Sequence, residues 1–337
     1  MGTDIKPKLF DTSKLSRKAL IGGTLIFSTI IMIAVLASAE PASTKNTMQT
    51  LTSEEWGLLP GETSAQAGTI TNGIGEKVAE VTFLDVGQGN CSICRLPGGV
   101  TIMVDAGSAD TVSTTIEYLD AAGIKTIKDL IISSASKEHF GGAQKLVESG
   151  RVETIYLPNI PADQINDADA YNELLKAIAD NDVKLLSPNQ GDIIYSDAEQ
   201  GVSFTVLSPV QKWKDLSNYS LVTRLIMGSV SFLFTGDAGE PLEQALHDTK
   251  QEVTSNVILI GNHGADSGTS IDFIDAVNPD YAVISVKGDP SGDNPSEDIL
   301  NRLLAREISI YRTDLNKAIT FNTDGKGIQV TDTKEGA

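Results

Sequence analysis

The sequence is poor in histidine, the commonest metal-binding side chain in proteins. It has three, His139, His247 and His263, in 337 residues. Centres for two zinc ions usually draw on several imidazoles, so a histidine-rich pair of zinc sites is excluded. The helical spacing of the leucines around His247 indicates a surface or half-buried helix residue there.

Basic residues are also few, 26 against 45 acidic ones, which gives a formal net charge of −19. A chain with this charge repels phosphate backbones and anionic lipids, so we expect no nucleic-acid partner. No internal repeat and no long block of like charge is present, which argues against a solenoid or a charged interaction tail. The 40% hydrophobic content is typical of a globular protein with one large domain or two small ones.

Cysteine is nearly absent, since Cys91 and Cys94 are the only two. They form a C-x-x-C pattern within residues 91–96, a segment that we expect to be a strand. Positions three apart on a strand face opposite sides, so a disulfide between them is geometrically poor. We interpret both as small buried residues and not as a redox pair.

Charged residues are missing from Ala19 to Ala39, and this stretch is mostly apolar. Its length suits a bilayer core of about 30 Å at about 1.5 Å per residue. By the positive-inside rule we expect residues 1–18 to be a basic cytoplasmic tail, residues 19–39 to be a single-pass anchor in the cell membrane, and the C-terminal domain to be extracytoplasmic. The alternative is secretion after cleavage near Ala39, because Ala37-Ser38-Ala39 also suits signal peptidase.

Large apolar residues are scarce from residue 40 to 77, which predicts a flexible linker. We expect a folded domain over 78–332 and a tail at 333–337. Strands alternate with helices, then follow one another without helices, then alternate again. Two sheets with helices outside suit this order, whereas a single Rossmann sheet does not. The expected strands are 79–83, 91–96, 100–105, 129–133, 154–157, 183–186, 201–208, 220–227, 229–235, 257–260 and 281–285, and the expected helices are 111–122, one from 142, 170–181, 271–277 and 296–306.

Seven short motifs occur in an order that resembles the metallo-β-lactamase-like domain of ComEC-type competence proteins. The resemblance covers about residues 78–332 and implies an α/β fold, the four-layer αββα sandwich. It also implies a metal-dependent hydrolase ancestor; the competence proteins are thought to degrade one DNA strand during uptake. Their multi-pass channel is not found here, so DNA import by this chain alone is not expected. The motifs are FLDVGQGN at 83–90, VDAG at 104–107, HFGG at 139–142, NYSLV at 218–222, FTGDA at 234–238, NHGA at 262–265 and YRTD at 311–314.

The resemblance also implies a metal centre, in which the family's H-x-H-x-D-H motif corresponds to Ser134, Ser136, Glu138 and His139. A neutral serine hydroxyl competes poorly with water for zinc, so two expected ligands are replaced. The remaining candidate ligands for zinc or another divalent metal are Glu138, His139, Asp237 and His263. Asp237 and Glu138 are also the candidate catalytic residues.

Each candidate has a structural interpretation as well. Glu138 can be a solvated turn residue, His139 a buried histidine inherited with the fold, and Asp237 the residue that holds the Gly236 turn. Asp85 and Asp105 can cap turns, as aspartate does beside glycine. Asn90 replaces the acid that would complete the GQGD motif.

We therefore expect a membrane-anchored metallo-β-lactamase-like domain with lost or impaired catalysis, no firm cofactor, and a role in binding a protein or cell-envelope ligand or in envelope assembly. The alternative is a hydrolase of phosphodiester or related ester bonds with a reduced metal site. One zinc with three protein ligands can still activate water, so the serines do not forbid chemistry. We expect the purified domain to carry well under one zinc per chain.

Overall fold

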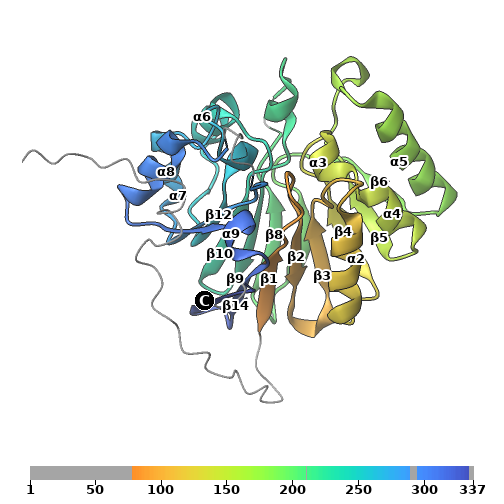
Figure 1. Ribbon diagram of the computed structural model, residues 1–337, viewed down its shortest axis with the longest axis horizontal. Helices are drawn as coiled ribbons and strands as arrows, with labels where there is room; N and C mark the ends of the chain where they lie inside the picture. The colour runs from red at the N-terminus through yellow and green to blue at the C-terminus, as the bar shows by residue number, and fades with distance from the viewer. Residues whose placement is uncertain (1–77, 210, 289–293, 334–337) are drawn as a thin grey trace, which may run out of the picture. The chain divides into compact units, whose positions relative to one another are not determined.

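The computed structural model describes residues 78–209, 211–288 and 294–333. They form two β-sheets that face each other, with helices on the two outer sides (Figure 1). One sheet has eight strands in the order β15-β14-β1-β2-β3-β4-β5-β6, and the other has seven in the order β13-β12-β11-β10-β9-β8-β7. The predicted α/β fold with two sheets is confirmed.

The strands are β1 (Ala79–Phe83), β2 (Ser92–Arg95), β3 (Thr101–Val104), β4 (Ile127–Ile131), β5 (Val152–Tyr156), β6 (Lys184–Leu186), β7 (Ile193–Asp197), β8 (Val202–Val206), β9 (Thr223–Met227), β10 (Val230–Phe234), β11 (Val257–Leu259), β12 (Tyr281–Ile284), β13 (Ser309–Arg312), β14 (Ile319–Thr323) and β15 (Ile328–Asp332). The α-helices are α2 (Val112–Ala121), α3 (Lys137–Phe140), α4 (Ala143–Glu148), α5 (Ala168–Asp180), α6 (Glu240–Asp248), α7 (Ile271–Val277), α8 (Glu297–Leu304) and α9 (Thr313–Asn316). The 3₁₀ helices used below are η4 (Leu216–Tyr219) and η5 (Gly261–Gly264).

The central strands of the first sheet are buried on both faces, and alternate residues of these strands enter different cores. Ile102 and Val104 of β3 face the core between the sheets, while Met103 faces the core under the helices α2, α4 and α5. The two cysteines are divided in the same way, Cys91 toward the helices and Cys94 toward the other sheet. Both are buried and free, as their spacing predicted.

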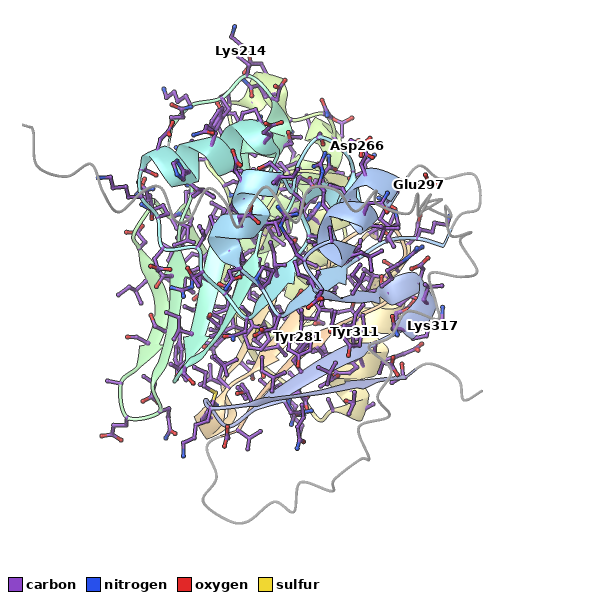
Figure 2. The ribbon with its side chains drawn as sticks, turned by 90° about the vertical axis from the view of Figure 1, so that its left-hand side faces the viewer. Lys214, Asp266, Tyr281, Glu297, Tyr311 and Lys317 are labelled. Carbon is purple, nitrogen blue, oxygen red and sulfur yellow. The ribbon has the colours of Figure 1, made fainter. Side chains whose placement is uncertain are left out.

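Aromatic rings fill the core between the sheets. The rings of Phe83 and Phe234, from opposite sheets, lie 6.0 Å apart between centroids. Tyr281 and Tyr311, labelled in Figure 2, both pack edge-on against Phe321 at 5.6 and 5.9 Å. These contacts tie the last strands of the chain to β12 and β13.

Parallel pairing brings strand ends together at one end of the sandwich. Strands β3, β4 and β5 are parallel neighbours in the first sheet, as are β10, β11 and β12 in the second. Loops that follow the carboxyl ends of parallel strands gather at one sheet edge, where α/β proteins commonly place their sites.

Two local features were not predicted. The helix expected from residue 142 is present as α4, but β4 ends at Ile131 and a one-turn helix, α3, precedes α4. Glu138 and His139 therefore lie on a helical turn. Strand β7 was not predicted, because it is an edge strand whose apolar Ile193 is 61% exposed, which hides the usual alternation.

The expected tail at 1–18, anchor at 19–39 and linker at 40–77 lie outside the described residues. Within the described ranges, no helix has both the length and the apolar character needed to span a membrane.

Candidate functional site

Strand ends from both sheets supply the site. From the first sheet come Asp105, directly after β3, and His139, on α3 after β4. From the second come Asp237, after β10, and His263, on η5 after β11. These segments are far apart in the sequence, and the parallel pairing within each sheet places them at the same end of the fold.

His139 is fully buried and its ring is held at both nitrogens. Nδ1 lies 2.8 Å from Oδ2 of Asp105, and Nε2 lies 2.8 Å from Oδ1 of Asp237. Burial alone would lower the pKa of His139, but the carboxylates of Asp237 and Asp105 outweigh it and raise the pKa well above its ordinary value. Carboxylate oxygens face both ring nitrogens, so this arrangement stabilises the imidazolium form of His139.

Asp105, which the sequence alone presents as a possible turn cap, contacts His139 at the centre of the site. Its carboxylate accepts hydrogen bonds from the backbone N–H and the hydroxyl of Ser133, both at 2.7 Å, in addition to its contact with His139. Its φ of +62° is a left-handed conformation, which few non-glycine residues adopt and aspartate adopts more readily than most. A carboxylate on the second nitrogen commonly orients a metal-binding histidine. The parallel pairing of β3 with β4 was the signal that links Asp105 to His139.

Asp237 is held in a tight glycine turn. Its backbone N–H donates to Oγ of Ser220 at 3.0 Å, and Gly236 before it has a φ of +58°. A side chain on Gly236 would overlap Ser133, so only glycine fits there. Burial works against the charge of Asp237, yet the neighbouring His139 holds its pKa well below the usual range.

The ring of His263 has one nitrogen, Nε2, without a hydrogen-bond partner among the described residues. Its Nδ1–H donates to the backbone carbonyl of Ser285 at 2.8 Å, which leaves the lone pair on Nε2. That Nε2 is buried and has no hydrogen-bond partner among the described residues; the nearest carboxylate oxygen, Oδ1 of Asp237, is 3.8 Å away. Burial, and then the charge on His139, lower the pKa of His263. His263 and Asn262 both have positive φ, 56° and 47°, so this turn holds a strained backbone.

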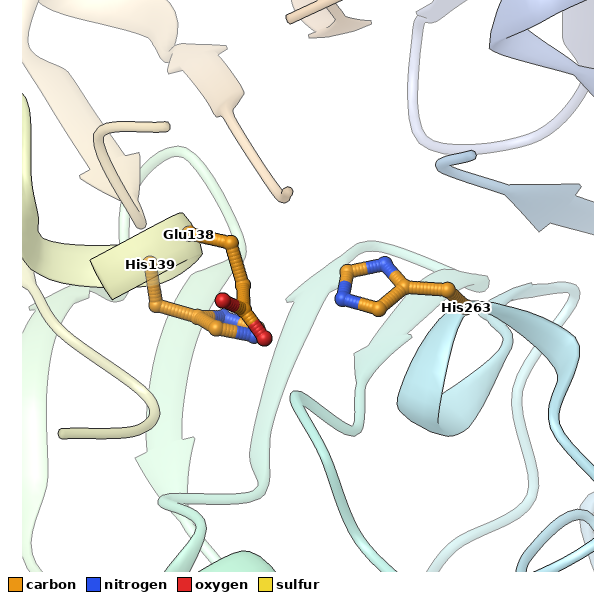
Figure 3. Close-up of side chains that lie close together, drawn as sticks. All are labelled: Glu138, His139 and His263. Carbon is orange, nitrogen blue, oxygen red and sulfur yellow. The ribbon is translucent and has the colours of Figure 1, made fainter. Parts of the chain in front are cut away.

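Three of the four predicted ligands converge. Glu138, His139 and His263 each offer one ligand atom, and these atoms all lie within 4.8 Å of one another (Figure 3). Asp237 is not a member of this group, although Oδ1 of Asp237 contacts His139 directly. Two imidazoles and a carboxylate are a donor set that zinc and related ions accept.

Comparison with known proteins assigns the family. The sequence model described as the metallo-beta-lactamase superfamily matches residues 84–289 of the chain. The chain belongs to this superfamily.

The relatives of the chain within this superfamily include competence proteins. It is 26% identical to ComE operon protein 3 of Bacillus subtilis over 260 residues, which are 72% of this chain and 33% of that protein. It is 28% identical to competence protein ComA of Neisseria gonorrhoeae over 284 residues, 81% of this chain and 37% of that protein. The chain thus spans about a third of the length of these relatives. The predicted ComEC-type domain is confirmed.

The superfamily implies a pair of metal ions, and the residues here fit only one of them. Ser134 and Ser136, at the positions of two imidazoles, lie with their hydroxyl oxygens 3.1 Å apart, and Oγ of Ser136 is 3.4 Å from Oδ2 of Asp237. Neutral hydroxyls do not fit a zinc ion. On the other side, the unpartnered Nε2 of His263 beside Glu138 and His139 fits a single divalent cation.

The remaining residues that the sequence analysis named lie around this centre or away from it. Asn90 is buried, and the two polar atoms of its amide have no partner among the described residues. Oδ1 of Asp85 accepts the backbone N–H of Gly87 at 3.2 Å, which is the turn cap that was expected. The side chain of His247 is 74% exposed on α6, and His247 does not belong to the group of ligand atoms formed by Glu138, His139 and His263.

Proposed function

We propose that this chain is a membrane-anchored, extracytoplasmic metallo-β-lactamase-fold protein in which metal-dependent catalysis is lost or impaired, and that its domain binds a protein or cell-envelope ligand. The observation that carries the proposal is the pair of hydroxyls, Ser134 and Ser136, where the superfamily supplies imidazoles. Two-metal hydrolysis would need both ions to be held, and at one of the two positions neutral hydroxyls stand in place of imidazoles and leave only the carboxylate of Asp237.

The charge network around His139 supports the same conclusion. Two buried carboxylates stabilise the imidazolium form of His139, and Nε2 has to lose its proton before it can become a metal ligand. Metal binding therefore competes with a favourable internal ion pair. We expect weak metal binding, strongest at high pH, and little metal on the chain at neutral pH.

A turnover assay tests the proposal. The purified full chain is supplied with Zn²⁺ or Mn²⁺ and a chromogenic phosphodiester, with the D237A variant as background. We expect wild-type and D237A rates to be equal at every metal concentration. A metal-dependent rate that exceeds background and disappears in D237A would refute the loss of catalysis.

A second candidate function is a hydrolase with one metal ion, favoured by the convergence of Glu138, His139 and His263. When bound, one ion would supply a Lewis acid and a water of lowered pKa. Glu138, His139 and His263 would hold that ion, and Asp105 would keep the ring of His139 in orientation. Turnover that saturates with one ion per chain and is lost in H263A would select this function over the first.

The membrane anchor is supported by the apolar, uncharged run at 19–39 and its basic N-terminal flank. With this orientation, protease added to intact cells should remove the domain. If the domain survives in intact cells and is digested only after lysis, the proposed topology is wrong.

Nucleic acid is not proposed as a partner, because the net charge of −19 opposes a polyanion. Single-stranded or duplex DNA should bind no better than the non-specific level of about 10⁻⁴ M at physiological salt. Sub-micromolar binding that weakens as salt is added would contradict this.

A further inference from the structure

The candidate metal centre has two sides: a serine side, formed by Ser134 and Ser136, and a histidine side, formed by Glu138, His139 and His263. The polar atoms of the two sides differ in whether they have hydrogen-bond partners. On the serine side, the hydroxyls of Ser134 and Ser136 are within hydrogen-bond distance of each other, and Ser136 donates to Oδ2 of Asp237. On the other side, Nε2 of His263 has no partner among the described residues.

Asp237 is fully held without any ion. Oδ1 lies against His139, Oδ2 accepts from Ser136, and the backbone N–H donates to Ser220. A hydroxyl proton and a metal cation compete for the same lone pairs of a carboxylate oxygen. Oδ2 of Asp237 already accepts from the hydroxyl of Ser136, so a first ion would have to displace this hydrogen bond and would gain only neutral hydroxyls as further donors.

We infer that the Ser134–Ser136 hydroxyl pair takes the place of the first metal ion of the superfamily, and that the centre accepts a single divalent ion on the side of Glu138, His139 and His263. The inference deepens the proposed function and rests on it, since the same hydroxyl pair explains why catalysis is impaired. According to this inference, the chain binds one divalent ion at saturation, and the two serines position the carboxylate of Asp237.

Replacing Ser134 and Ser136 with histidine should restore the first metal site. In S134H/S136H the two imidazoles, together with the carboxylate of Asp237, supply three protein ligands, a number with which catalytic zinc sites are commonly built. A matched control adds two histidines at two exposed serines, S113H/S196H, and accounts for adventitious binding by imidazole. Ser113 lies on α2 and Ser196 on β7, and both are exposed.

The experiment is equilibrium dialysis of the full chain in detergent against rising Zn²⁺, with the bound metal measured by elemental analysis. We expect one saturable ion in the wild type and in S113H/S196H, and two in S134H/S136H. Two saturable ions or none in the wild type, or one in a folded S134H/S136H, would overturn the inference.

A second pair of variants keeps the inference open to refutation if S134H/S136H does not fold. S134A/S136A removes only the hydroxyls and should keep the single ion, whereas H263A should lose it. Loss of the ion in S134A/S136A together with its retention in H263A would place the ion on the serine side and overturn the inference. The readout is a stoichiometry, so a wild type with one ion and real turnover would refute the loss of catalysis and leave the single-ion centre standing.

Discussion

Raising the pH above neutrality should destabilise the metal-free chain through His139. Its ring nitrogens each lie 2.8 Å from a buried carboxylate, and Asp237 and Asp105 raise the pKa of His139 despite its burial. The folded chain keeps a proton that the unfolded chain releases near pH 6.5. The stability that this proton contributes is therefore complete below about pH 6.5 and is lost as the pH rises toward the folded pKa.

A difference of one bound proton changes the free energy of unfolding by about 1.4 kcal/mol per pH unit, so between pH 7 and pH 8 we expect a loss of about 1 kcal/mol. His263 contributes little in this window, because its pKa is lowered by burial and it is neutral in both states. Burial raises the pKa of Cys91 to about 12 and also raises that of Cys94, so both thiols stay protonated in the folded chain. The unfolded thiols begin to ionise within this window, which adds a smaller loss of about 0.3 kcal/mol by pH 8, whether or not His139 is present.

The assay is urea unfolding of the full chain in detergent with a chelator present, at several pH values from 7 to 8. H139Q should show almost no loss of stability with pH, while H247Q should follow the wild type because the side chain of His247 is 74% exposed. A wild-type slope equal to that of H139Q would refute the buried imidazolium.

Two further predictions concern the packing around the site. Gly89 has a φ of +144°, and a Cβ there would overlap the carbonyl oxygen of Glu138, whereas Gly150 also has a positive φ but has open space around it. We therefore expect G89A to lower the free energy of unfolding in urea by about 1–3 kcal/mol more than G150A does. Equal losses would contradict the close contact between Gly89 and Glu138. Cys91 and Cys94 are buried, and burial raises the pKa of both thiols. A thiol reagent at pH 8 should therefore label neither cysteine in the folded chain and both in urea. Rapid labelling of the folded chain would show that the segment around β2 is accessible to solvent.

The sequence predicted much of the fold because the apolar pattern of the strands is local. Val81 and Phe83 alternate with polar neighbours and were correctly predicted as part of a strand. The pairing of β1 with β14 could not be read in the same way, since Thr82 and its partner Thr320 are 238 positions apart and nothing local joins them.

The candidate site was predictable where a motif marks it and not where only geometry does. His139, Asp237 and His263 follow recognisable strand ends, and the structure brings all three together. The single helical turn of α3 has too few residues to show a helical period, so the position of Glu138 on it was not predicted. The role of Asp105 depends on the adjacency of β3 and β4, which is a tertiary fact.

Elemental analysis of the full chain purified without added metal, beside H139A and D237A, measures whether the centre holds zinc. We expect well under one zinc per chain in all three, because hydroxyls replace two ligands and two carboxylates stabilise the protonated form of His139. Stoichiometric, tightly held metal in the wild type that vanishes in both variants would contradict this expectation.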